Sequence, residues 1–201
     1  MANTFCRLVS IPSPSQSELG VATHIKRRLD SLGVDNYFDG AANYTKSDTG
    51  NLVAKIGNGR PSLMFVAHMD TVEDGKQRIS PRVKGGVIKS AGKTILGADD
   101  KAGVTALLGA ISELHKTADI PATTFVFTTT EEGGDAAMGA SHIGIKEQID
   151  FTFSVDGSDR PGMFMHQALG TMMFEVEIKG KQAHAEIRPE KGANAVKAAS
   201  I

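Results

Sequence analysis

Between residues 63 and 155, segments with the composition of buried strands alternate with segments of helical periodicity. The strand-like runs cover residues 63–67, 123–129 and 151–155, and the helical ones cover residues 102–114 and 136–148. Strands rich in β-branched and aromatic residues fit a sheet that is buried on both faces. Strands that alternate with helices form a mostly parallel sheet covered by helices, so the sequence predicts an α/β domain.

Residues before this region predict one further helix. Val21, Ile25 and Leu29 recur at helical spacing, which predicts a helix over residues 18–32. Gly33 is placed to end that helix, because glycine readily adopts the left-handed conformation of a C-cap. The other short elements expected are a strand over residues 52–56, joined by a turn to residues 63–67, and a minor hairpin around residues 85–89.

The pattern changes near the end of the chain. Residues 173–178 alternate between apolar and polar, as a strand with one solvated face does, and a helical pattern begins at residue 193. This stretch is too short to bury a core of its own. We therefore expect an α/β domain over residues 1–168 and the incomplete beginning of a second, α+β domain over residues 169–201.

Composition excludes several classes of protein. The 22 Lys and Arg residues against 23 Asp and Glu residues give a net charge of -1, so no basic surplus exists to neutralise a nucleic-acid backbone. The single cysteine, Cys6, cannot form an internal disulfide, which fits a reducing compartment. No apolar run approaches membrane-spanning length, and the first residues lack a signal-peptide pattern. We expect a cytoplasmic protein without a nucleic-acid or membrane partner.

Acidic residues and one histidine lie at or just beyond the ends of the predicted strands. They are His68 and Asp70, Asp99, Glu131 and Glu132, and Asp156. Ligands of α/β sheets bind beyond the carboxyl ends of the strands. Carboxylates that converge there repel one another unless a cation compensates, and oxygen and imidazole donors suit a divalent metal. Each motif alone is better explained by an ordinary surface residue, a solvated acidic turn or a helix cap, but their shared position favours a metal site.

The spacing within two of these motifs has a physical reason. Residues i and i+2 of a strand point the same way, so Asp70 can accept a hydrogen bond from one ring nitrogen of His68 and leave the other for metal. Glu131 and Glu132 would face opposite sides of a strand, and both reach one site only if the backbone turns, which Gly133 permits. One glutamate would then bind metal and the other act as a general base.

The order of these motifs and the residues in them resemble those of a known family. The motifs are AHMDTV at residues 67–72, LGADDKAG at 96–103, TEEG at 130–133 and VDG at 155–157. They are similar to the zinc-dependent exopeptidases related to peptidase T, carboxypeptidase G and acetylornithine deacetylase, and most similar to the peptidase T-like tripeptide aminopeptidases. The segments GKQAHA at 180–185 and PEKGANA at 189–195 resemble that family's lid and dimerisation domain. The similarity runs from about residue 10 to the end.

The resemblance implies a role for each residue around two divalent ions, Zn²⁺ first and Co²⁺ or Mn²⁺ as alternatives. It implies that His68 and Asp156 bind one ion, that Glu132 binds the other, and that Asp99 bridges them. It implies that Asp70 orients His68. It also implies that Glu131 is the catalytic base acting on a metal-bridged water and that His184 stabilises the tetrahedral intermediate. It also implies a cis peptide after Asp99 and a homodimer formed through the lid domain.

The implied activity is hydrolysis of short peptides. Aspartate at position 156 favours an aminopeptidase of the tripeptidase type, because other branches of the family often carry glutamate there. A dipeptidase, a carboxypeptidase or an N-acyl amino acid deacylase would use the same residues. A fourth alternative is a truncated, non-catalytic metal-binding fragment, because the family's last metal-binding histidine belongs to a longer chain.

Overall fold

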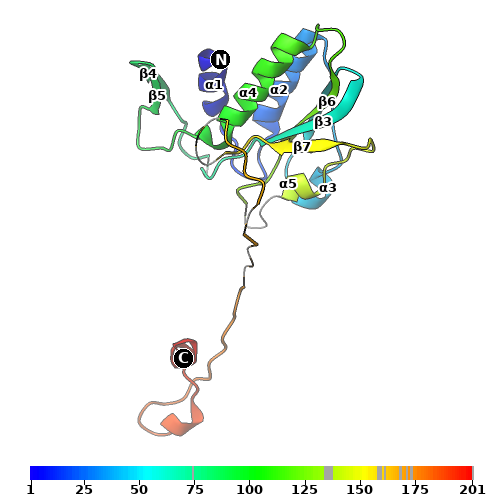
Figure 1. Cartoon of the computed structure of the whole chain (residues 1–201). Helices are drawn as coiled ribbons and strands as arrows, with labels where there is room; N and C mark the ends of the chain where they lie inside the picture. The colour runs from blue at the N-terminus through cyan, green and yellow to red at the C-terminus, as the bar shows by residue number, and fades with distance from the viewer. Residues whose placement is uncertain are drawn as a thin grey trace. The chain divides into compact units, whose positions relative to one another are not determined.

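The computed structural model describes residues 1–73, 75–133, 138–157, 160, 162–167, 169–170, 172 and 174–200. The chain divides into two compact units, Met1–Pro161 and Gly162–Ile201 (Figure 1). Across the described ranges, no helix is both long and apolar enough to span a bilayer.

A five-stranded sheet with the order β1-β2-β6-β3-β7 forms the centre of the first unit. Its strands are β1 (Asp35–Phe38), β2 (Leu52–Ile56), β3 (Gly59–His68), β6 (Pro121–Thr128) and β7 (Phe151–Ser154). β3 runs parallel to both β6 and β7, whereas the β1–β2 and β2–β6 pairs are antiparallel. The predicted α/β class is confirmed, and parallel pairing is confined to β6, β3 and β7. The strands β2 and β3 follow one another in the sequence, but β6 lies between them.

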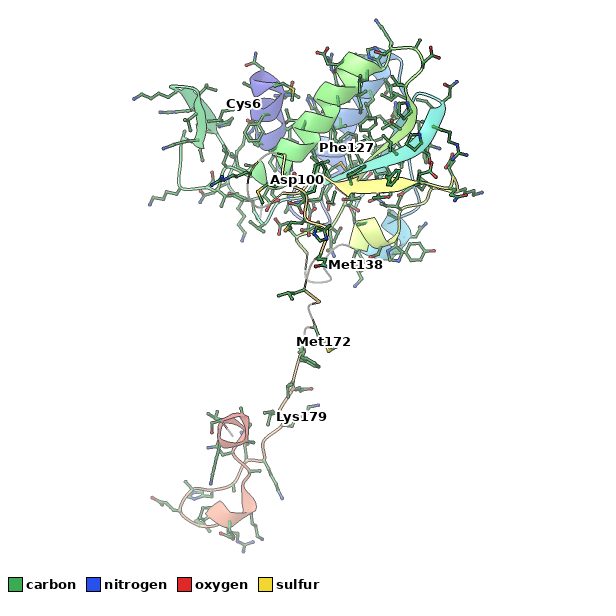
Figure 2. All side chains as sticks on the ribbon, in the orientation of Figure 1. Cys6, Asp100, Phe127, Met138, Met172 and Lys179 are labelled. Atoms are coloured by element: carbon green, nitrogen blue, oxygen red, sulfur yellow. The ribbon has the colours of Figure 1, made fainter. Side chains whose placement is uncertain are left out.

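Helices cover both faces of this sheet. In Figure 1, α1 (Ala2–Val9), α2 (Leu19–Leu32) and α4 (Ala98–Leu114) lie on one side, and the short α3 (Ala42–Thr45) and α5 (Met138–Ser141) lie on the other. Phe125 and Phe127 of β6 pack with the apolar residues of α1, α2 and α4. Val126, between them, belongs to a separate cluster with Val53 and Val66. Alternate residues of one strand therefore serve two cores, as the strand period requires. Figure 2 labels Phe127 among the side chains of this unit.

Most of the predicted elements are present. α2 buries Val21, Ile25 and Leu29, and it ends at Gly33, which has a left-handed φ of 71°. α4 contains the predicted helix over residues 102–114. The predicted hairpin is formed by β4 (Pro81–Lys84) and β5 (Val87–Ser90).

Two predicted elements are wrong over their described residues. The helix expected over residues 136–148 is reduced to α5, and its first two positions lie outside the described residues. Ile143 and Ile145 instead pack against the valine cluster at a spacing of two, which a helix cannot provide.

The strand expected over residues 173–178 is not formed at 174–178, and residue 173 lies outside the described residues. Phe174 and Val176 are exposed, and no strand of the described chain pairs with them, so nothing fixes a pleat there. The second unit does form the 3₁₀ turn Pro189–Lys191. It also forms α6 (Ala195–Ala199), which lies within the helical pattern predicted from residue 193.

The parallel strands place the loops that matter for function. His68 at the end of β3 pairs with Thr128 at the end of β6, and Val66 pairs with Ser154 at the end of β7. The carboxyl ends of the three strands therefore meet at one edge of the sheet. The residues that follow them in the sequence start from neighbouring positions.

Candidate metal centre

The end of β3, the loops after β6 and β7 and the first turn of α4 bring five potential metal ligands together. Ligand atoms of His68, Asp99 and Glu132 lie within 4.8 Å of one another, and those of Asp99, Asp100 and Asp156 form a second group under the same limit. Asp99 belongs to both groups. A carboxylate has two oxygens, so one that is shared in this way suits a bridging position between two cations.

His68 is oriented through its Nδ1 atom. The residue is 3% exposed, and its Nδ1 lies 3.1 Å from the backbone oxygen and 3.3 Å from Oδ1 of Asp70. Its Nε2 lies 3.1 Å from Oδ1 of Asp99. A histidine whose Nδ1 is held by a carboxylate or carbonyl presents Nε2 to a metal. The contact expected from the His68-x-Asp70 spacing is therefore present.

Asp70 also holds the loop that carries both glutamates. Its Oδ1 accepts a hydrogen bond from the backbone N–H of Glu131 at 3.0 Å, and its Oδ2 accepts one from Glu132 at 2.9 Å and one from Oγ of Ser15 at 2.6 Å. Burial alone would raise the pKa of Asp70, but these bonds and His68 outweigh it and lower the pKa to about 2. The charged Asp70 carboxylate thus fixes His68 and the glutamates together.

Asp99 and Asp100 are neighbours in the sequence but make different contacts. Both have non-helical backbone angles, and the peptide between them is cis, as expected. The Asp99 side chain is 71% exposed and contacts His68. Asp100 is buried, and its Oδ1 accepts a hydrogen bond from the N–H of Gly103 at 3.0 Å, which is the contact of a helix cap. Figure 2 labels Asp100 at the base of α4.

Negative charge accumulates where these residues meet. Burial raises the pKa of Glu131 and Glu132, and the nearby carboxylates add to this against the opposing effect of His68. Burial raises the pKa of Asp156 as well, and Asp99 adds to it. A cation among these carboxylates would relieve their mutual repulsion.

The pKa values of two buried residues of the site, His68 and Asp100, are also shifted. Burial lowers the pKa of His68, but Asp70, Asp100 and Asp99 outweigh that effect and raise it to about 9. Burial, assisted by Asp156, raises the pKa of Asp100 to about 7. The raised pKa of His68 shows the excess of carboxylate around a single imidazole. Imidazole nitrogen and carboxylate oxygen are ligands of Zn²⁺ and similar ions, so these residues fit a divalent metal centre.

Two buried charged residues that were not predicted from the sequence support the site. Lys101 is 1% exposed, and its Nζ donates hydrogen bonds to Oγ of Ser13, at 2.7 Å, and to the backbone oxygen of Met69. Burial lowers the pKa of Lys101 to about 8, against the opposing effect of nearby carboxylates. Glu18, at the start of α2, is fully buried.

A signal for both residues exists in the sequence. Lys101 precedes Val104 and Leu108 by three and seven positions, and Glu18 precedes Val21 and Ile25 in the same way. Each charged residue therefore lies on the apolar stripe of its helix, where burial is expected.

His184 belongs to the second unit. It is exposed, and its Nδ1 accepts hydrogen bonds from the backbone N–H groups of Glu186 and Ile187, both at 3.3 Å. These contacts are local to the loop, and a role for His184 with substrate stays a prediction.

Comparison with known proteins identifies relatives of this chain. The sequence model of the peptidase family M20/M25/M40 matches residues 64–200. The uncharacterized protein YqjE of Bacillus subtilis strain 168 is 35% identical over 201 residues, which cover 98% of this chain and 53% of YqjE.

Two solved structures match almost the whole chain. A tripeptidase from Staphylococcus aureus subsp. aureus Mu50 superimposes with a TM-score of 0.76 at 30% identity, and the aminopeptidase PepT from Bacillus cereus ATCC 10987 does so with a TM-score of 0.74 at 30% identity. Each match covers 99% of this chain and 54% of the other. The chain thus spans about half the length of these three relatives.

Proposed function

Because the chain belongs to the peptidase family M20/M25/M40, we propose that its metal centre is part of an aminopeptidase that releases the N-terminal residue of short peptides. The observation that carries the proposal is Asp99, which is shared by two groups of ligands and interacts electrostatically with the carboxylate of Glu131. The likeness to a tripeptidase and to an aminopeptidase supports the choice of substrate.

The residues present can be assigned to two divalent ions, Zn²⁺ in the first instance and Co²⁺ or Mn²⁺ as alternatives. In this assignment, which follows the family resemblance, His68 and Asp156 would hold one ion, Glu132 the other, and Asp99 both. The ligand atoms themselves group differently, with His68 near Glu132 and Asp156 near Asp100, and Asp99 in both groups. Such ions supply Lewis acidity, which makes a water more acidic and polarises the scissile carbonyl.

The remaining chemistry is proton transfer by Glu131. Its carboxylate takes the proton of the attacking water and delivers it to the nitrogen of the leaving amine. Burial and neighbouring carboxylates raise the pKa of Glu131, which moves it towards the range in which a group both accepts and donates a proton near neutral pH. Asp70 keeps this residue in place through the Glu131 N–H.

Three further parts of the proposal rest on the family resemblance, and Cys6 supports the last of them. His184 stabilises the tetrahedral intermediate, the full-length protein is a homodimer through its lid domain, and the enzyme acts in the cytoplasm. The free Cys6 thiol is compatible with that reducing compartment.

The test is a substrate panel in the presence of each metal. The chain and any longer form of the protein are loaded with Zn²⁺, Co²⁺ or Mn²⁺ and given tripeptides with a free N-terminus, the same tripeptides N-acetylated, dipeptides and N-acyl amino acids. We expect metal-dependent release of the N-terminal residue from the free tripeptides, and loss of that release in Glu131→Gln. Preference for acylated substrates would identify a deacylase or carboxypeptidase, and metal binding without hydrolysis in every form would identify a non-catalytic fragment.

A further inference from the structure

The turn that presents Glu131 and Glu132 begins at a strained residue. Thr130 has a φ of 55°, in the left-handed region. A β-branched side chain rarely adopts that conformation, which persists only where surrounding contacts determine it. The contacts that hold Thr130 therefore decide where the next two side chains point.

Two buried carboxylates hold three successive backbone N–H groups of this turn. Glu18 Oε1 accepts a hydrogen bond from the N–H of Thr130 at 2.8 Å, and the Asp70 carboxylate accepts those of Glu131 at 3.0 Å and Glu132 at 2.9 Å. Oγ1 of Thr130 also donates to Glu18 Oε1, at 3.4 Å. Asp70 already orients His68, so Glu18 is the additional anchor, and it acts at the strained residue itself.

Glu18 is itself fixed from other directions. Its Oε2 accepts a hydrogen bond from Oγ of Ser47 at 2.5 Å, and its Oε1 accepts one from the N–H of Gln16 at 3.1 Å. The buried ammonium of Lys101 lies close enough to Glu18 to interact electrostatically with it. A fully buried carboxylate with this many partners is a rigid support rather than a solvated helix end.

We propose that Glu18 is a positioning residue for the metal centre: it holds Thr130 in its left-handed conformation and so sets the positions of Glu131 and Glu132. The inference rests on the proposed function, in which Glu132 binds metal and Glu131 moves the proton. Glu18 contacts none of the reacting groups, so its effect passes through the backbone of the turn.

Three substitutions separate hydrogen bonding from charge. Glu18→Gln keeps an acceptor oxygen for Thr130 and provides an amide that can donate to Ser47, but removes the charge. Glu18→Asp keeps the charge and withdraws the acceptor by one methylene. Glu18→Ala removes both. If Glu18 has a positioning role, the Glu18→Gln variant must behave like the native protein and the Glu18→Asp variant must behave like Glu18→Ala.

Asp150→Ala is the matched control. The Asp150 carboxylate also holds a loop, because it accepts hydrogen bonds from the N–H of Ser62 at 2.7 Å and from Oγ of Ser62 at 3.0 Å. It precedes β7 and therefore lies at the opposite end of the parallel strands from the metal centre. Its loss removes a comparable support without touching the turn.

Two readouts are needed. The first is amide hydrogen exchange of residues 130–132 in the metal-free chain, where we expect exchange about tenfold faster in the Ala and Asp variants and little change in Gln and in the control. The second is titration with Co²⁺ alone, followed by its visible absorption, where we expect about tenfold weaker affinity and an altered spectrum in Ala and Asp.

The outcomes distinguish the two proposals. Unchanged amide exchange of residues 130–132 in the Glu18→Asp and Glu18→Ala variants would overturn the role of Glu18. Faster exchange in these variants together with a native Co²⁺ affinity would overturn it as well. If Ala does not fold, the contrast between Gln and Asp decides the question. If the native chain binds no Co²⁺, the proposed metal centre fails, and the exchange data still decide whether Glu18 holds the turn.

Discussion

Oδ1 of Asp70 lies 3.3 Å from Nδ1 of His68, and both side chains are buried at the end of β3. This contact and the bonds to the glutamate turn lower the pKa of Asp70 to about 2, below its ordinary value of 3.8. A carboxylate with a lowered pKa in the folded state stabilises that state above its unfolded pKa and loses this contribution as pH falls through the folded pKa.

Asp70→Asn should therefore reduce the free energy of unfolding in a pH-dependent way. We expect a loss of about 2 kcal/mol at pH 7, which corresponds to the shift in pKa, and a shrinking difference between the variant and the native protein as pH falls from about 4 to 2. Urea unfolding in the presence of a chelator measures both. Asp35→Asn, at an exposed position, should change stability by less than about 0.5 kcal/mol. A difference that is constant with pH would show that the Asp70 charge is not the cause.

Glu131→Gln and Glu132→Gln should separate catalysis from metal binding. The first removes the proposed base but no ligand, so activity should fall at least about 100-fold while metal content stays near the native value. The second removes a ligand, so metal content and activity should fall together. Metal analysis after dialysis, alongside a peptide assay on the active form, measures both. Equal metal loss in the two variants would mean that their roles are exchanged or shared.

Asp99→Ala should lower the metal content of the chain more than the loss of any other single ligand does, because Asp99 belongs to both ligand groups. We expect the variant to retain less than one ion per chain after dialysis, whereas Asp156→Ala should retain more. Glu113→Ala, an exposed acidic residue on the same helix, is the control and should bind metal like the native chain. Retention of both ions by Asp99→Ala would exclude a bridging role.

Gly139→Ala should destabilise the fold without altering any candidate ligand. A Cβ atom at this position would lie 2.1 Å from the backbone oxygen and 2.7 Å from the backbone nitrogen of Thr129, so the backbone must shift. We expect the free energy of unfolding to fall by about 2 kcal/mol, as for other overpacked sites. Gly92→Ala, where a Cβ meets nothing within 4 Å, should stay within about 0.5 kcal/mol of the native protein. Similar values for both would show that α5 moves freely away from Thr129.

Sequence periodicity predicts the elements whose apolar residues recur regularly. α2 and the strands β3 and β6 were predictable because Val21, Ile25 and Leu29, or runs of β-branched residues, repeat at a single period. The segment over residues 142–148 was not, because Ile143 and Ile145 can be assigned to a strand, a helix or a loop until their packing partners are known. The place of β6 between β2 and β3 depends on long-range pairing, which has no local signal.

The sequence predicted which side chains lie near one another at the candidate site and the contact between His68 and Asp70, but not the other contacts that support them. His68, Asp99, Glu132 and Asp156 follow strand ends or precede a helix, and the parallel register then brings them together. The supports of the site act through backbone N–H and C=O groups that any residue carries. Their partners therefore cannot be read from residue type.

β7 is the outermost strand of the sheet, and its outer edge pairs with no other strand of the described chain. Phe151 on this strand is 57% exposed. An open edge with an aromatic side chain is a template on which a further strand can add, whether from the same polypeptide or from another copy. Storage of this chain at high concentration therefore favours edge-to-edge self-association at β7, and a lysine at position 151 would oppose it by placing charge where a neighbouring strand must dock.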